Sequence, residues 1–155
     1  MLTLGIDPGL SGACALLDYD GVLLMLADLP VIRDGKLSWI DGARFQSLLL
    51  DAIEGRPTRA IVERVQAMPA QGRSSAFNFG VGFGSMLGVL QTLQVSLEFV
   101  TPAQWKRDLG LDSDKRKSLD RARLLYPTAE LRLAKHDGRA EALLIANWAA
   151  MRRSH

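Results

Sequence analysis

A succession of short apolar segments constrains the fold of this chain more than any other feature. Segments of strand length cover residues 2–7, 12–17 and 22–28. Turn signals separate them, an Asp-Pro-Gly sequence after the first and Asp-Tyr-Asp-Gly at 18–21 after the second. Because consecutive strands joined by short turns pair with one another, this part of the chain predicts an antiparallel meander of three strands.

Helical and strand patterns alternate later in the chain. Ser38 lies three residues before Asp41, which is the spacing of a helix capping box, and apolar residues then repeat at helical spacing as far as Ile53. We therefore expect Ser38 to begin a helix that ends near Gly55. The order of all segments predicts a mixed α/β fold with both kinds of strand pairing, in a single domain over residues 1–155. The further segments are strands over 59–63 and 95–100, a long helix over 74–93, and helices that begin near residues 102, 113 and 137.

Three glycines at a spacing of four mark one face of the long helix. Gly80, Gly84 and Gly88 would let this helix approach a sheet or a partner closely. The segment 74–97 carries no charge, but its amide and hydroxyl side chains make it a poor membrane span. We expect a buried helix in a soluble protein that has no membrane partner.

Cysteine usage and the first residues indicate a cytoplasmic protein. Cys14 is the only cysteine, so no internal disulfide can form, and no Cys/His cluster has the spacing of a zinc site. The first residues lack the charged n-region of a signal peptide.

The charge of the chain is distributed unevenly. The formal net charge is only +2, which argues against a nucleic-acid partner at first sight. Residues 1–100 carry a net of −3, however, and residues 101–155 a net of +5. A local basic patch matters more to a polyanion than the total does, so a nucleic-acid partner remains compatible with this composition.

Four acidic residues fall where predicted elements begin or end. Asp7 and Glu63 end two strands, while Asp137 and Glu141 are four apart on the first turns of the last helix. If the two strands are neighbours, one sheet edge carries both strand-end acids, and the helical pair shares one face. Like charges at such spacing repel each other, and a divalent cation between them reverses that penalty. Oxygen ligands of this kind suit Mg²⁺ or Mn²⁺.

Each of these acids also has an ordinary structural interpretation. Asp7 could start a turn, and Glu63 could pair with Arg64 or face solvent. Asp137 and Glu141 suit the N-terminus of a helix, as a cap and as a partner of the helix dipole. The set of four, which one sheet could bring together, favours a metal site over these separate roles.

Three segments around these acids resemble the acidic motifs of RuvC-type Holliday junction resolvases. They are Gly5-Ile6-Asp7-Pro8-Gly9 with Ser11-Gly12, then Ile61-Val62-Glu63, and finally Asp137-Gly138-Arg139-Ala140-Glu141-Ala142-Leu143. The resemblance runs from residue 2 to about residue 150. It implies an RNase H-like α/β fold with a mixed five-stranded sheet, three antiparallel strands followed by two parallel ones, flanked by helices. The last motif is most similar to phage-type members, and it departs from many bacterial members in carrying Glu141 instead of aspartate. The resemblance thus implies the cytosol of a bacterium or of a phage-infected host.

The resemblance also implies an activity, that of a crossover junction endodeoxyribonuclease acting in DNA recombination or repair. It implies two Mg²⁺ or Mn²⁺ ions per active site, with Asp7 bridging both, Glu63 on one, and Asp137 and Glu141 on the other. Two metal ions of this kind promote hydrolysis of phosphodiesters by in-line displacement. Paired nicks made in this way would resolve Holliday or other branched junctions. His136 is a candidate for proton transfer, because histidine titrates near neutrality, although a lone histidine before a helix is more often an ordinary polar residue.

Basic and aromatic residues are candidates for DNA contacts. Without the resemblance, the basic residues of the two helices after residue 101 would be read as a solvated face. With it, Lys106 and Lys117 fall at the spacing of phosphate-contacting lysines in resolvases, and Lys115 belongs to the same basic segment. The start of the long helix adds donors suited to phosphate and a ring suited to stacking on an unpaired base. These are Arg73, Ser74, Ser75 and Phe77. Phe79 cannot share a helix face with Phe77, so one of the two rings is expected in the core, and the sequence leaves open which one.

The expected partners are a four-way DNA junction and a second copy of the chain. A junction has two-fold symmetry, so a homodimer with two sites is the economical solution. The apolar flanks of the glycine helix could form its interface or ordinary core; they are Val81, Met86, Leu87 and Leu90. Two alternatives stay open, an RNase H-like nuclease acting on RNA–DNA hybrids or flaps, and a non-catalytic junction-binding protein. An actin-like ATPase is disfavoured, because the chain is too short for two lobes.

Overall fold

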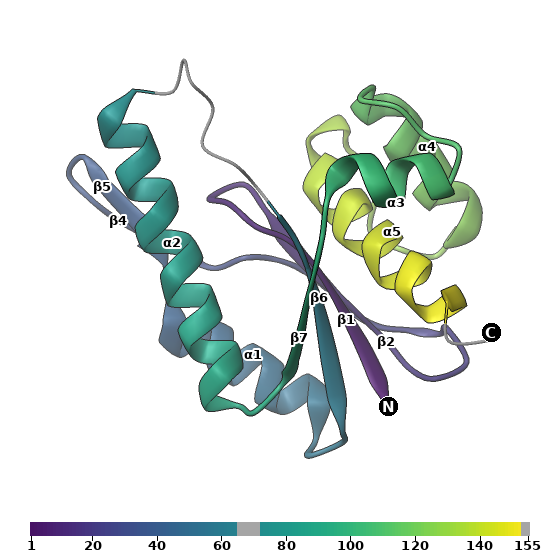
Figure 1. Ribbon diagram of the computed structural model, residues 1–155, viewed down its shortest axis with the longest axis horizontal. Coiled ribbons are helices and arrows are strands. Elements are labelled where there is room, and N and C mark those ends of the chain that lie inside the picture. Colours follow the sequence, from purple (N-terminus) through teal and green to yellow (C-terminus); the bar gives the residue numbers. More distant parts are fainter. Residues whose placement is uncertain (65–71, 153–155) are drawn as a thin grey trace.

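The computed structural model describes residues 1–64 and 72–152, in which helices cover both faces of one central sheet (Figure 1). The strands are β1 (Leu2–Asp7), β2 (Ala13–Leu17), β3 (Leu23–Asp28), β4 (Val31–Asp34), β5 (Leu37–Ile40), β6 (Thr58–Glu63) and β7 (Ser96–Val100). The helices are α1 (Gly42–Ile53), α2 (Arg73–Thr92), α3 (Pro102–Asp108), α4 (Lys115–Leu125) and α5 (Asp137–Met151), with a short 3₁₀ turn, η1 (Ala134–His136), before α5.

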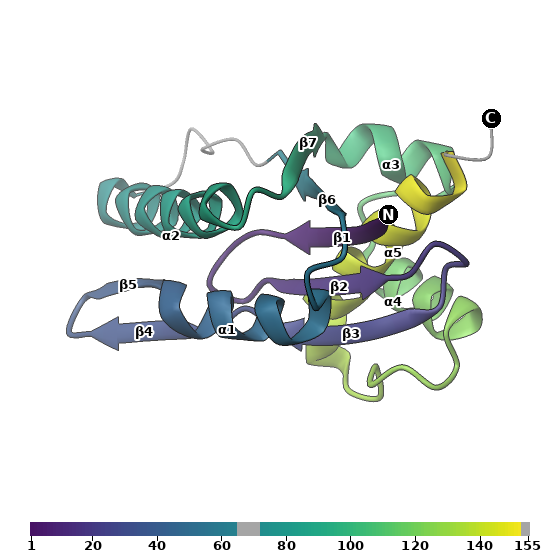
Figure 2. The same ribbon diagram turned by 90° about the horizontal axis from the view of Figure 1, so that it is seen from below.

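The central sheet combines antiparallel and parallel pairing in the order β3-β2-β1-β6-β7. β2 pairs antiparallel with β1 and with β3, whereas β6 runs parallel to β1 and to β7. Figure 2 shows the five strands following one another in this order across the molecule. The predicted sheet, three antiparallel strands followed by two parallel ones, is confirmed.

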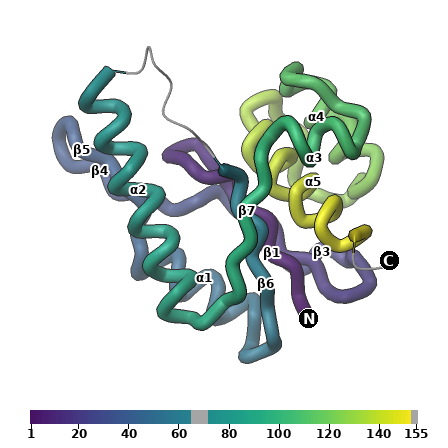
Figure 3. The backbone as a smooth tube through the Cα atoms, in the orientation of Figure 1, coloured from purple at the N-terminus to yellow at the C-terminus, as the bar shows by residue number. Residues whose placement is uncertain are grey.

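Alternating side chains of the strands divide the apolar core into two halves. Leu4 and Ile6 of β1 and Val62 of β6 pack with α1 and α2. Gly5 and the side chain of Ile61 lie on the opposite face of the sheet, in the half of the core that contains α5. Figure 3 shows α1 and α2 on one side of the sheet and α3, α4 and α5 on the other. Successive residues of β1 and β6 therefore reach opposite layers of helices.

Helix α5 packs directly on β1 because Gly5 has no side chain. A Cβ atom at Gly5 would lie 2.2 Å from the carbonyl oxygen of Ala142 and 2.5 Å from the amide nitrogen of Ala146. Both alanines are fully buried. Small residues on the strand and on the helix thus set a short distance between the sheet and α5.

A hairpin of β4 and β5 lies between β3 and α1, where the sequence pattern predicts no strand. Ser38 lies in β5, opposite Arg33, so the prediction that Ser38 begins the helix is wrong. Asp41 caps α1 instead, accepting a hydrogen bond from the backbone N–H of Arg44 at 3.1 Å. Each strand has only four residues, which is too short for a clear alternating pattern, and Gly35, with φ of +58°, begins the two-residue turn between them.

The glycine face of α2 points away from the core. Gly80, Gly84 and Gly88 are exposed, and a Cβ atom at any of them would meet no atom within 4 Å. These glycines therefore do not let α2 approach the sheet, so that part of the expectation is wrong, while close approach to a partner stays a prediction. Met86 and Leu90 are fully buried in the core, which is the second of the two roles considered for them. In the described part of the chain, no helix is long and apolar enough to span a membrane.

Candidate active site

Two acids lie next to each other at the C-terminal ends of adjacent strands of the central sheet. Ile6 of β1 pairs with Val62 of β6, so the residues that follow them, Asp7 and Glu63, lie at the same edge. Side chains alternate along a strand, and Gly5, two residues before Asp7, lies against α5. The two strand-end acids therefore lie on the face of the sheet that α5 covers.

The first two turns of α5 bring two further acids to this edge. Gly138 lies so close to the turn after β1 that an added Cβ atom would be 2.7 Å from the carbonyl oxygen of Ser11. The same atom would be 3.2 Å from Oδ2 of Asp7. Asp137 precedes this glycine and Glu141 follows it by one turn, so both are held next to the strand-end acids.

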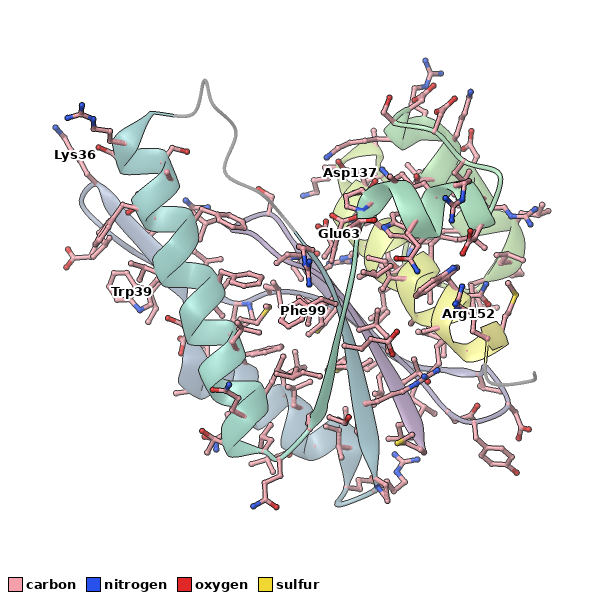
Figure 4. The ribbon with its side chains drawn as sticks, viewed as in Figure 1. Lys36, Trp39, Glu63, Phe99, Asp137 and Arg152 are labelled. Atoms are coloured by element: carbon pink, nitrogen blue, oxygen red, sulfur yellow. The ribbon has the colours of Figure 1, made fainter. Side chains whose placement is uncertain are left out.

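A single cavity of about 740 Å³ joins the four acids. Figure 4 shows two of them, Glu63 and Asp137, close together between the end of β6 and the start of α5. The loop after β1, the start of α2 and the start of α4 complete the wall. The lining residues are Asp7, Pro8, Gly9, Leu10, Ser11, Gly12, Glu63, Ser75, Asn78, Phe79, Lys115, Asp137, Gly138 and Glu141.

Two lysines that the sequence predicts to contact DNA bind acids of this group in the structure, and their contacts with DNA stay a prediction. Nζ of Lys106 donates a hydrogen bond to Oε1 of Glu141 at 2.7 Å, and both side chains are nearly buried. Nζ of Lys115 donates to Oδ2 of Asp137, also at 2.7 Å, in a more exposed position. Helices α3 and α4 thus supply two ammonium groups that offset part of the negative charge of the site.

Glu63 is fixed by a tryptophan that no motif singles out. Nε1 of Trp105, a fully buried side chain of α3, donates a hydrogen bond to Oε1 of Glu63 at 2.8 Å. Burial raises the pKa of Glu63, and the hydrogen bond from Trp105 opposes that rise. Thr101 caps α3 by accepting a hydrogen bond from the backbone N–H of Gln104, and so fixes the helix that carries this indole.

The pKa of Asp7 is strongly perturbed by its surroundings. Burial, followed by the negative charges of Glu63 and Glu141, raises the pKa of Asp7 from 3.8 to about 8. Partial burial is the largest single influence on Asp137 and acts to raise its pKa. The hydrogen bond and positive charge of Lys115, together with hydrogen bonds from the backbone N–H groups of Gly138 and Asp137, outweigh burial and hold that pKa below its usual value. Crowded carboxylates of this kind favour any cation that binds between them.

The residues of the cavity fit divalent metal ions in charge and in donor type. Four carboxylates are hard oxygen ligands of the kind that Mg²⁺ and Mn²⁺ prefer. Across residues 1–64 and 72–152, no three His, Cys, Asp or Glu side chains converge on one ion-sized point. Lys106 and Lys115 occupy oxygens of Glu141 and Asp137 instead, and release of these two lysines would make the oxygens available to a metal ion.

The raised pKa of Asp7 predicts how stability depends on pH when metal is removed. Between 3.8 and about 8, the folded protein holds a proton on Asp7 that the unfolded chain releases. Stability from this group is therefore present at low pH and falls as pH rises through that window. In EDTA, the melting temperature of the wild type should fall more steeply from pH 5 to pH 8 than that of Asp7→Asn, as measured by calorimetry. Parallel curves for the two proteins would contradict the assigned shift.

His136, the candidate for proton transfer, does not line the acidic cavity. It is only 6% exposed, and its Nδ1 has no hydrogen-bond partner in the described structure.

Arg139, in the first turn of α5, forms a two-pronged ion pair with Asp28 at the end of β3. Nε lies 2.6 Å from Oδ1 and Nη2 lies 2.9 Å from Oδ2. This pair ties the start of α5, and with it Asp137, to the antiparallel half of the sheet.

The remaining candidates for DNA contacts fall in three places. Ser75 lines the acidic cavity. Arg73, Ser74 and Phe77 line a separate hollow beside the β4–β5 hairpin. Lys117 is exposed, lines neither hollow, and pairs with an aspartate of the loop before α4.

Two residues of α2 that are not among the predicted DNA contacts, Asn78 and Phe79, also line the cavity. They follow Ser75 by three and four positions, so all three side chains share one face of a helix. That spacing is visible in the sequence and would have identified them once Ser75 was accepted as a site residue.

Comparisons with known proteins agree with this architecture. No protein family model matches the chain. A curated relative, the chloroplastic Holliday junction resolvase MOC1 of Chlamydomonas reinhardtii, is 39% identical over 102 residues. The match covers 62% of this chain but only 12% of that protein, so the chain spans a small part of its relative's length.

Two solved structures of RuvC from Thermus thermophilus match nearly the whole chain. RuvC in complex with a Holliday junction substrate has a TM-score of 0.69 and 22% identity, covering 99% of this chain and 96% of that one. A second RuvC structure has a TM-score of 0.61 and 19% identity over the same shares. The motifs, the sheet order and these matches together establish that the chain has the fold of RuvC, an RNase H-like α/β architecture.

Proposed function

We propose that this chain is a divalent-metal-dependent endonuclease that resolves Holliday junctions or other branched DNA by paired nicks. The observation that carries the proposal is the single cavity lined by carboxylates from two strand ends and one helix, namely Asp7, Glu63, Asp137 and Glu141. The similarity to a protein named as a Holliday junction resolvase, and to a RuvC structure with a junction substrate, supports DNA junctions as the substrate class.

The four acids are the proposed ligands of two Mg²⁺ or Mn²⁺ ions. When bound, such ions activate water and stabilise the leaving 3′-oxygen of a phosphodiester. The protein contributes orientation, because the indole of Trp105 holds one oxygen of Glu63 in place. Lys106 and Lys115 border the same acids, so once released they provide positive charge where a DNA phosphate would enter.

A homodimer is part of the proposal, because symmetric nicks in a four-way junction require two active sites. The exposed glycine face of α2 is a candidate surface for the contact, since Gly80, Gly84 and Gly88 leave it flat and open. Sedimentation of the protein with and without junction DNA measures this assembly directly.

A panel of substrates tests the proposed activity against its alternatives. Four-way, three-way, flap, linear duplex and RNA–DNA hybrid substrates are incubated with Mg²⁺, Mn²⁺ or EDTA. We expect cleavage of branched DNA with either metal ion and none in EDTA. Cleavage of the hybrid alone would favour an RNase H activity, and junction binding without cleavage in any metal would favour a non-catalytic junction-binding protein.

Removing one of the site's own cations should strengthen metal binding. Lys115→Met leaves Asp137 without its ammonium partner, so we expect Mg²⁺ to bind roughly three- to tenfold more tightly in the absence of DNA. Isothermal titration calorimetry measures this affinity independently of cleavage. Lys117→Met removes the same charge from the same helix outside the cavity and should leave the affinity within about twofold. Equal changes in the two variants, or weaker binding by Lys115→Met, would contradict the prediction.

A further inference from the structure

A second hollow, which we call the hairpin groove, lies between the turn of the β4–β5 hairpin and the start of α2. Its volume is about 380 Å³. Figure 4 shows Lys36 at the tip of the hairpin, beside the first turn of α2. The groove is lined by Lys36, Leu37, Arg73, Ser74, Phe77 and Asn78.

Direct contacts hold the hairpin against α2. Nδ2 of Asn78 donates a hydrogen bond to the backbone carbonyl of Lys36 at 3.0 Å, which fixes the turn. At the other end of the hairpin, Ile40 is 1% exposed and packs next to Gly82, where an added Cβ atom would lie 3.7 Å from it. The groove therefore has two fixed walls, although they lie far apart in the sequence.

The charge of the groove is positive and unbalanced. Lys36 and Arg73 are exposed and take part in no salt bridge within residues 1–64 and 72–152, and the same holds for Arg33 on β4. Asp34 is the single acid of the hairpin and is itself exposed. Phe77, which lines the groove together with these two cations, is 64% exposed. Cations beside an exposed aromatic ring form the combination that binds a nucleic-acid strand, through phosphates and through base stacking.

The hairpin groove adjoins the acidic cavity. Asn78 lines both hollows, and Ser75 and Phe79, on the same turns of α2, line the cavity. A strand that crosses the start of α2 would thus pass from one hollow into the other.

We propose that the hairpin groove holds the sugar–phosphate backbone of a DNA strand that enters or leaves the acidic cavity. Lys36 and Arg73 bind its phosphates, and Phe77 contacts one of its bases. This inference rests on the proposed nuclease function and adds the β4–β5 hairpin to the DNA-binding surface.

Charge reversal at Lys36 tests the groove. The affinity for a four-way junction is measured in EDTA, by fluorescence anisotropy over a range of salt concentrations. Lys36→Glu should weaken binding roughly tenfold and reduce the slope of log K against log salt by about 1, the value for one lost phosphate contact. Arg44→Glu makes the same change of charge on an exposed residue of α1 that lines neither hollow, and its slope should equal that of the wild type.

A cross-linking experiment locates the strand. Lys36→Cys carries a photoreactive group on its new thiol, and Cys14 does not compete because it is fully buried. Illumination should attach the protein to the strand that is cut, close to the cut site, whereas Arg44→Cys should attach to little DNA.

The outcomes separate this inference from the function on which it rests. If the wild type binds and cleaves junctions while Lys36→Glu behaves like Arg44→Glu, the proposed role of the groove in DNA binding is overturned and the nuclease proposal stands. If the wild type binds no DNA, both are overturned. If Lys36→Glu changes sedimentation and leaves the salt slope unchanged, a second copy of the chain occupies the groove and the inference is wrong.

Discussion

Asp7→Asn should abolish cleavage of branched DNA while leaving junction binding within a few-fold of the wild type. The negative charges of Glu63, Glu141 and Asp137 all act on Asp7. The substitution therefore removes a carboxylate that is coupled to each of the other three. We expect a fall in cleavage rate on the order of 10³-fold or more, equivalent to about 4 kcal/mol of activation free energy. Single-turnover cleavage in Mg²⁺ and anisotropy in EDTA measure the two properties separately.

The melting temperature tests whether the Asp7→Asn protein remains folded. Because the amide relieves repulsion among buried carboxylates, we expect its melting temperature in EDTA at pH 8 to exceed that of the wild type. Asp51→Asn, the same substitution at an exposed position of α1, should change neither cleavage nor melting temperature. Cleavage of a junction by Asp7→Asn at the wild-type rate would refute the assignment of this cavity as the active site.

Gly5→Ala should destabilise the fold severely. The added methyl group would meet the carbonyl oxygen of Ala142 at 2.2 Å and the amide nitrogen of Ala146 at 2.5 Å, and backbone atoms of a buried helix cannot move aside independently. We expect a loss of at least about 3 kcal/mol in the free energy of unfolding. That corresponds to a fall of roughly 6–12 °C in melting temperature for a chain of this size, or to failure to fold.

The matched control is the same substitution on the exposed face of α2. A Cβ atom at Gly84 would meet nothing within 4 Å, so Gly84→Ala should stabilise the protein by up to about 1 kcal/mol through its helix propensity. Denaturant unfolding of both variants measures the difference. Similar stabilities for Gly5→Ala and Gly84→Ala would show that α5 does not pack on β1 as closely as described.

The arrangement of the acids was predictable because it follows from local rules. Asp7 and Glu63 end apolar strands, and parallel neighbours deliver their C-terminal residues to one edge. Asp137 and Glu141 follow helical spacing. The four residues can be brought together from the sequence by three things. These are the alternation of side chains along a strand, the spacing of residues along a helix, and one assumption about which strands pair.

The partners of the acids were not predictable, because they depend on where separate elements pack. Lys106 and Lys115 read as members of a basic surface, yet the positions of α3 and α4 turn them toward Glu141 and Asp137. Trp105 reaches Glu63 across 42 positions of sequence. No periodicity encodes contacts of that range.

The hairpin escaped prediction for a different reason. Ser38 and Asp41 satisfy the spacing of a capping box, but the same residues fit a strand followed by a cap. Pairing with β4 decides between the two, and a pattern of four residues cannot report a pairing partner.

The packing of α5 on β1 also sets the order in which the site can form during synthesis. Asp7 leaves the ribosome more than a hundred residues before Asp137 and Glu141. Closure of this contact must wait for almost all of the described chain, and contacts of such long sequence separation form slowly. Under the proposed function, a nascent chain therefore carries only two of the four proposed metal ligands and stays inert toward nucleic acid until α5 has been made and docked.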